Sequence, residues 1–157
     1  MAVGLVTLGL RVVPGVEIQI TQRAITDSRS IKYLETMGEF AALLDAVSDS
    51  VVVEAITRLQ ADPEKRMKDI VDMYTAWMSG RVEDVGALMR RAALGRFPQV
   101  REIVFDRRNL NWLPRITATL SSPKPTLILV GAGHLAGESG LLALLKRAGH
   151  EVSPVAY

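Results

Sequence analysis

Apolar and polar residues alternate along most of the chain with the three- and four-residue spacing of amphipathic helices. The clearest run begins at Asp62-Pro63, an N-cap residue followed by proline at the first helical position, and ends before Gly80. A second run begins at Val82 and is closed by Gly95. The same spacing predicts further helices over residues 16–26, 40–47, 51–59, 100–104, 109–120 and 139–148.

Three shorter apolar segments have the length and composition of strands. They are residues 31–34, 126–130 and 151–156, the last with Pro154 in a position typical of a sheet edge. The sequence therefore predicts a helix-rich α/β or α+β fold, with a small, mostly parallel sheet and a central helical segment. We expect one domain over residues 1–157, in which the apolar residues 4–13 form a strand or helix and not a signal peptide.

The composition adds few constraints on function. The chain has 19 basic and 17 acidic residues, a net charge of +2, and no block of like charge that would indicate nucleic-acid binding. It contains no cysteine, so disulfide bonds and thiolate metal sites are excluded. No apolar run reaches the ~20 residues of a membrane span. We therefore expect no nucleic-acid partner and no membrane-spanning segment.

The turn from Gly131 to His134 is the first candidate for chemistry, because it follows the predicted strand 126–130. Ligands of open α/β sheets bind at the carboxyl ends of strands. His134 is either a metal ligand or general base, or a hydrogen-bonded structural histidine. Gly131 and Gly133 allow a tight turn and the approach of a substrate. Their spacing is close to a dinucleotide fingerprint, but no acidic residue ends the last predicted strand, so we expect no dinucleotide.

Two further positions carry candidate chemistry. Glu35 follows a short apolar segment, where a carboxylate can ligate a metal or act as a base. Its alternative role is that of an N-cap or first-turn acid of the next helix. Arg108 and Asn109 place a forked cation beside an amide, a pair suited to binding an oxyanion. Their alternative role is that of an ordinary helix boundary.

Four segments form a combination more specific than any one of them. They are GVE from Gly15, YLET from Tyr33, YTAWMSG from Tyr74, and RNLNWLPRI from Arg108 continuing to VGAGHLAG from Val130 and GLL from Gly140. In this order they resemble the TraB/GumN (TraB/PrgY/GumN) family, which includes the Tiki-like proteases. The family is related in fold to ChaN and the erythromycin esterases, so the resemblance implies half of such a fold.

The resemblance implies a metal-dependent hydrolase of the protease or esterase type. Gly131 to His134 corresponds to the second of two G-x-x-H motifs of the family. His134 and Glu35 are thus implied as catalytic residues and as ligands of a divalent Mn, Co or Zn ion. Arg108 and Asn109, with Gly131 and Gly133, are implied to bind the substrate or to hold the geometry of the site. The alternative is a non-catalytic family member that binds a ligand or partner.

Nothing in residues 1–14 matches the first G-x-x-H motif, so the resemblance implies a chain that lacks the usual N-terminal portion. A sheet without its first strands exposes an edge and an apolar face. We therefore expect self-association or pairing with a missing N-terminal segment. No signal peptide is evident, which leaves a bacterial cytoplasmic or an envelope-associated location open.

Overall fold

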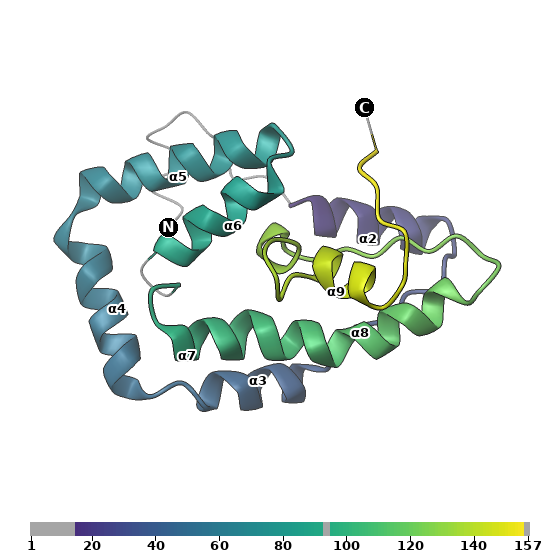
Figure 1. The fold of residues 1–157 in the computed structure, drawn as a ribbon, viewed down its shortest axis with the longest axis horizontal. Helices are drawn as coiled ribbons and strands as arrows, with labels where there is room; N and C mark the ends of the chain where they lie inside the picture. The colour runs from purple at the N-terminus through teal and green to yellow at the C-terminus, as the bar shows by residue number, and fades with distance from the viewer. Residues whose placement is uncertain (1–14, 93–94, 156–157) are drawn as a thin grey trace. The chain divides into compact units, whose positions relative to one another are not determined.

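A computed structural model describes residues 15–92 and 95–155 of the chain (Figure 1). The protein is helical: 66% of the structure is helix, and no β-strand occurs in these two described ranges. The chain divides into two compact units, residues 1–33 and residues 34–157. No helix in the described ranges is long and apolar enough to cross a membrane.

The first unit contains the helix α2 (Val16–Thr26), over the range that the apolar spacing predicts. Gly15 precedes this helix and Asp27 follows it. Near its end, Arg23 Nε lies 3.0 Å from Asp27 Oδ2, an exposed ion pair at i,i+4 spacing. The prediction of this helix is confirmed.

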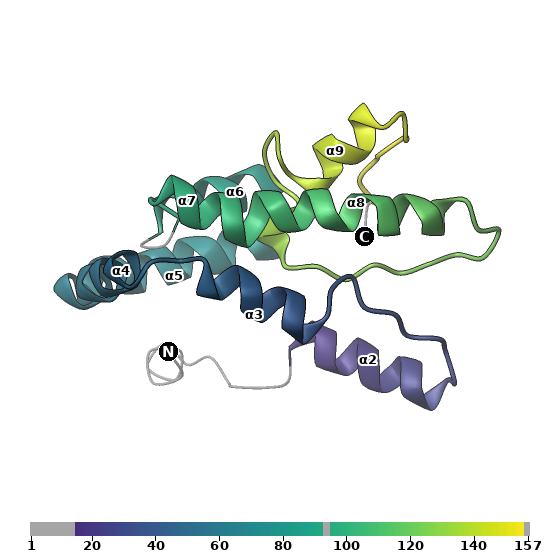
Figure 2. The ribbon, with the colours of Figure 1, turned by 90° about the horizontal axis from the view of Figure 1, so that it is seen from below.

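The second unit is an array of helices with one long extended segment. Its elements are α3 (Met37–Asp45), α4 (Asp49–Ala61), α5 (Pro63–Met78), α6 (Val82–Arg91), α7 (Pro98–Arg101), the π-helix η1 (Glu102–Asp106), α8 (Arg107–Leu120), the 3-10 turn η2 (Ala132–His134) and α9 (Leu141–Arg147). α5 packs on α6, α8 packs on α9, and α3 lies beside η1 (Figures 1 and 2). The turn η2 contacts α6 and η1, which places the loop with His134 against two helices.

Local sequence signals explain where several helices begin and end. Thr36 caps α3: its Oγ1 accepts the Glu39 N–H at 3.1 Å, while the Glu39 carboxylate accepts the Thr36 N–H at 2.6 Å. Asp62 Oδ1 accepts a backbone N–H of the first turn of α5 at 2.8 Å. Gly80 (φ 65°) and Gly149 (φ 86°) follow α5 and α9 in the left-handed region that glycine tolerates. The predicted boundaries at Asp62, Gly80 and Gly149 are confirmed. The start of α3 differs, because the sequence predicts a helix over residues 40–47 and no cap at Thr36.

The apolar core has its centre where α8 meets α9. Trp112, Ile116, Leu141 and Leu144 form one buried cluster there. Side chains from the extended segments and from both helices pack against it: Leu34, Leu113, Ile128, Val130, Leu135 and Leu145. The loop before α9 is therefore fixed from both sides, by α6 and η1 at one end and by this core at the other.

The predicted α/β fold, with a small, mostly parallel sheet like half of a ChaN or erythromycin-esterase fold, is wrong. Residues 31–34, 126–130 and 151–155 contain no strand. A strand needs a second strand to complete its hydrogen bonds, and within the described ranges no hydrogen bond between two backbone groups engages these segments. The predicted element over residues 4–13 lies outside the described residues, as does residue 156.

The start of α8 also differs from the sequence prediction. The pattern predicts Asn111 as a cap, with Pro114 in the first turn or at a kink. Instead helical conformation runs from Pro98 through α7 and η1, and Pro114 lies inside α8. The first turns of α8 form because tertiary contacts hold them: Asn109 and Trp112 are both buried. Tertiary packing overrides the local proline signal here.

Candidate functional site

One face of α8 meets the segment that precedes α3. Arg108, Trp112 and Arg115 share this face, because they are spaced by four and three residues. Arg108 and Trp112 donate hydrogen bonds to Glu35. Arg115 donates to the Leu34 carbonyl. Three side chains of one helix therefore hold a segment more than seventy residues away in the sequence.

An ion pair between Arg115 and Glu39 fixes the start of α3. Arg115 Nη2 donates to Glu39 Oε1 at 2.9 Å. Hydrogen bonds from the Thr36 backbone N–H and from Arg115 lower the pKa of Glu39 to about 2. Because Glu39 is also the third residue of α3, the capping box and the link to α8 share one carboxylate.

Glu35 accepts three hydrogen bonds from α8. Arg108 donates through Nη2 to Oε1 at 2.6 Å and through Nε to Oε2 at 3.1 Å, a bidentate pair. Trp112 Nε1 donates to Oε2 at 3.1 Å. The side chains of Arg108 and Glu35 are only 15% and 19% exposed, so water reaches little of the pair. Glu35 does not cap α3, since Thr36 does.

Arg108 makes further contacts with two aromatic rings and with a backbone carbonyl. Its Cζ lies 5.0 Å from the centre of the Phe40 ring and 4.7 Å from that of Trp112, which are cation–π distances. Its Nη1 donates to the Val104 carbonyl at 3.1 Å. Val104 belongs to η1, and π-helical interruptions of this kind are frequent at functional sites.

His134 is buried, with 6% exposure, and both ring nitrogens are hydrogen-bonded. Nε2 lies 3.2 Å from Arg108 Nη1, which can only donate, so Nε2 accepts. Nδ1 lies 2.7 Å from Asn109 Oδ1. The Asn109 amide nitrogen donates to the carbonyls of His134 and Ser139 at 3.2 and 2.8 Å, which leaves its oxygen facing the ring. The network therefore requires a neutral imidazole with its proton on Nδ1.

The surroundings of His134 oppose its protonation. Burial lowers the pKa of His134 from 6.5 to about 4, and the Arg108 cation lowers it as well. The Glu35 carboxylate raises the pKa of His134, but by less than burial and Arg108 lower it. The rings of Phe105 and Trp112 lie with their centres 5.1 and 4.5 Å from the imidazole and exclude water from it. His134 is thus neutral at physiological pH, but it is a weak base.

The glycines of this loop differ in how much space the structure leaves for a side chain. A Cβ on Gly133 would lie 2.2 Å from Met89 Sδ and 3.0 Å from Phe105 Cε1, so a side chain here would displace the end of Met89 and crowd the Phe105 ring. A Cβ on Gly131 would meet only His134 Cδ2, at 3.7 Å, an ordinary contact distance. Gly137 has a φ of 78°, which side chains rarely adopt.

The arrangement of Glu35 and His134 does not fit a metal ion between them. Both side chains bind the same guanidinium, and a divalent cation at that place would meet the positive charge of Arg108. Catalytic zinc sites use three protein ligands. In the described part of the chain no group of three His, Asp, Glu or Cys side chains is placed to hold a metal.

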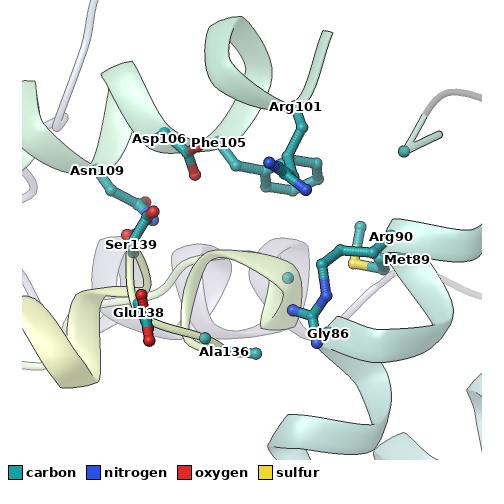
Figure 3. Close-up of a pocket in the computed structure, with 13 residues that line it drawn as sticks. Gly86, Met89, Arg90, Arg101, Phe105, Asp106, Asn109, Ala136, Glu138 and Ser139 are labelled. Atoms are coloured by element: carbon teal, nitrogen blue, oxygen red, sulfur yellow. Dashed lines mark hydrogen bonds between the residues drawn. The ribbon is translucent and has the colours of Figure 1, made fainter. Parts of the chain in front are cut away.

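A cavity of about 350 Å³ borders the same loop (Figure 3). Its walls come from α6, from the end of α7, from η1 with the start of α8, and from the loop after His134. Asn109 and Gly133 belong to these walls, so the cavity is adjacent to the hydrogen-bond network of His134. Four charged side chains also line it: Arg90, Arg101, Asp106 and Glu138.

The structure brings four of the predicted site residues into one network: Glu35, Arg108, Asn109 and His134. Gly131 and Gly133 flank it in the loop. Their roles in catalysis, metal binding or substrate binding stay predictions. The contacts do show that Arg108 and Asn109 are not merely residues at the boundary of a helix, because both bind the His134 ring.

Sequence reasoning missed the aromatic side chains of this network and the charged side chains of the cavity. Trp112 is predicted only as a core or groove-wall residue, yet it also donates to Glu35. Its spacing of four residues from Arg108 was the available signal, because it places both on one helix face. No comparable signal in the sequence links Phe40 to Arg108, since they belong to different helices.

The fold and these contacts define a helical protein with a partly buried Glu–Arg–His network beside a cavity. A family model described as the TraB/PrgY/gumN family matches residues 4–154, essentially the whole chain. The chain therefore belongs to the TraB/PrgY/gumN family, and the resemblance seen in the sequence is confirmed. No curated protein and no solved structure matches the chain.

Proposed function

We propose that this chain is a non-catalytic, ligand-binding member of the TraB/PrgY/gumN family. The observation that supports this role is the Arg108 guanidinium, which occupies both oxygens of Glu35 and Nε2 of His134 at once. A general base needs a free lone pair and a pKa near neutrality, whereas the pKa of His134 is lowered to about 4. The cavity beside Asn109 provides space for a ligand.

Hydrolysis assays test this proposal. Purified chain is incubated with chromogenic amide and ester substrates, with and without Mn²⁺, Co²⁺ or Zn²⁺. We expect hydrolysis at the buffer background in the wild type and in His134→Ala alike, with His150→Ala as the matched control. Metal-stimulated hydrolysis that disappears in His134→Ala and persists in His150→Ala would overturn the proposal.

Metal-dependent hydrolysis, the activity implied by the family, is the second candidate. The observation that favours it is the anchoring of His134. Metal-ligating histidines donate their other ring N–H to an oxygen, which fixes the tautomer, and Asn109 Oδ1 occupies that position at 2.7 Å. This function requires Arg108 to leave Glu35 and His134, so that both side chains become available to an ion.

Substitution of Arg108 separates the two candidates. Titration calorimetry with Zn²⁺ compares Arg108→Gln with Arg107→Gln, whose exposed side chain pairs with Glu102. The non-catalytic proposal predicts no zinc binding in either variant, because only two donor side chains remain. Zinc binding by folded Arg108→Gln that is lost on adding His134→Ala supports the second candidate. Circular dichroism of each variant shows whether the helical fold is retained.

The surface of the second unit supports a further proposal, self-association. Large apolar side chains are exposed on α4 and α5: Val52, Val53, Ile56, Val71, Tyr74, Trp77 and Met78. Leu127 and Leu129 on the extended segment are exposed as well, by 69% and 41%. Tyr74 and Trp77 of α5 are neighbours, with ring centres 6.5 Å apart, and contiguous exposed apolar surface is typical of protein–protein contacts. We expect a second copy of the chain to cover part of it.

A further inference from the structure

The cavity beside Asn109 has a charge arrangement that the network of Glu35, Arg108 and His134 does not use. Two guanidinium groups, of Arg90 and Arg101, line it together with two carboxylates, of Asp106 and Glu138. Among the described residues no hydrogen bond or ion pair engages any of these four side-chain charges. Its volume of about 350 Å³ lies at the lower end of the range for small-molecule sites.

The backbone around the cavity leaves room for the Arg90 guanidinium. A Cβ on Gly86 or on Gly137 would lie 3.2 Å from Arg90 Nη1, closer than nine in ten real Cβ contacts, so the guanidinium would have to shift slightly. Gly137 also has a φ of 78°, so a side chain there is disfavoured for two reasons. The two glycines therefore allow Arg90 to reach the cavity from α6. Arg101 extends into it from the end of α7 (Figure 3).

The two signs of charge lie toward different ends of the cavity (Figure 3). Arg90 and Arg101 belong to α6 and α7, whereas Asp106 and Glu138 belong to η1 and to the loop after Gly137. In Figure 3 the guanidinium groups lie toward the α6 side, and the carboxylates lie toward Asn109 and Ser139. A simple anion would be attracted by the groups at one end of the cavity and repelled by those at the other, and so would a simple cation.

We infer that this cavity binds a small zwitterion that carries one carboxylate and one ammonium group, as an amino acid or dipeptide does. Its carboxylate binds Arg90 and Arg101, and guanidinium groups suit carboxylates because they can donate two parallel hydrogen bonds. Its ammonium group binds Asp106 and Glu138. The inference rests on the proposed ligand-binding function and names its ligand class.

Asn109 connects this cavity to His134. Its side chain lines the cavity and its Oδ1 accepts the His134 Nδ1 proton at 2.7 Å. A ligand that contacts Asn109 therefore changes the surroundings of the imidazole. The backbone amides of Gly86, Gly133 and Gly137 report binding directly, and the His134 ring signals report its transmission to the network.

Amide-resolved NMR titrations test the inference, with metal ions removed by EDTA. The probes are alanyl-alanine, its N-acetyl form without the ammonium group, its C-terminal amide without the carboxylate, and inorganic phosphate. We expect saturable shifts at the three glycines with alanyl-alanine, and at least about tenfold weaker binding of each blocked form, the scale of one lost charged hydrogen bond. Arg90→Gln and Asp106→Asn should each weaken the binding of alanyl-alanine by a similar factor. Lys124→Gln, in the exposed segment that follows α8, should leave the binding unchanged.

Several results would overturn the inference. They are the absence of saturable shifts, equal binding of the dipeptide and its blocked forms, and phosphate binding as tight as that of alanyl-alanine. Unchanged affinity in folded Arg90→Gln and Asp106→Asn, judged by retained amide dispersion, would also overturn it. Because EDTA is present, these results do not depend on hydrolysis. A metal-dependent activity of His134 would instead contradict the proposed non-catalytic function.

Discussion

Asn109 and Arg108 are neighbours in the sequence but hold opposite nitrogens of the same histidine. Arg108 donates to Nε2 and Asn109 accepts from Nδ1. In the described residues every buried side-chain nitrogen or oxygen has a hydrogen-bond partner. Removal of either partner therefore leaves a buried polar group unsatisfied, which costs about 1–3 kcal/mol for a neutral group and more for a charge.

The lowered pKa of His134 makes stability depend on pH. In the unfolded chain this side chain takes up a proton near pH 6.5, and in the folded chain only near pH 4. As the pH falls, the unfolded state binds the proton first, so the free energy of unfolding decreases between these values. At pH 7 the contribution is fully present, and at pH 4 about 3 kcal/mol of it is lost.

Urea unfolding between pH 4 and pH 7.5 measures this dependence. We expect His134→Gln to reduce the slope between pH 4 and pH 6.5, even if it lowers stability at every pH. His150→Gln removes the other histidine of the chain and should keep the His134-dependent slope. Equal slopes in the wild type and His134→Gln would show that the imidazole is not buried and neutral.

The sequence predicted the residues of the site better than their contacts. Glu35, Arg108, Asn109 and His134 are each candidates on local grounds, since their residue types and positions suggest chemistry. That Arg108 binds Glu35 and His134 together depends on how α8 packs against the segment before α3. No periodicity within one element contains that information. The structural alternatives, a helix cap for Glu35 and a helix boundary for Arg108 and Asn109, also follow from local sequence. For Glu35 this alternative does not hold, because Thr36 caps α3.

At the scale of elements, we expect the packing of the loop before α9 to depend more on Gly133 than on Gly131. Gly133→Ala places a Cβ 2.2 Å from Met89 Sδ and 3.0 Å from Phe105 Cε1, so the flexible end of Met89 must move and the Phe105 ring is crowded. We expect a loss of stability of about 1–3 kcal/mol, as for other overpacked sites. Gly131→Ala is the matched control, because its Cβ meets only an ordinary contact. Thermal unfolding of both variants measures the difference; equal midpoints would contradict the close approach of η2 to α6.

Helices were predictable here, and strands were not. A helix completes its hydrogen bonds within one segment, so Asp62, Pro63 and Gly80 suffice to mark α5. A strand depends on a partner, and the apolar run of residues 126–130 contains no information on whether a second strand lies beside it. Ile128 and Val130 pack on the α8–α9 core while Leu127 and Leu129 are exposed, without a neighbouring strand in the described residues. The apolar run predicts a buried strand, whereas the structure buries one side of the segment only and forms no sheet with it.

At the scale of the whole molecule, exposed apolar surface predicts that copies of the chain associate. Tyr74 and Trp77 on α5 are 45% and 49% exposed, with ring centres 6.5 Å apart. We expect size-exclusion chromatography with light scattering to give a mass above 17.2 kDa that rises with concentration. Trp77→Gln should weaken association, whereas Lys68→Gln on the same helix should not. A concentration-independent mass of one well-folded chain would contradict this prediction.

The central claim is that Arg108 and Asn109 hold His134 as a neutral, Nδ1-protonated imidazole. The most direct measurement is the nitrogen-15 spectrum of the histidine rings, assigned with His134→Gln and followed from pH 3 to pH 8. The account predicts that at pH 7 the His134 Nδ1 carries the proton and Nε2 does not, and that the ring becomes doubly protonated only near pH 4. A proton on Nε2 at pH 7, or protonation of the ring near pH 6.5, would contradict it.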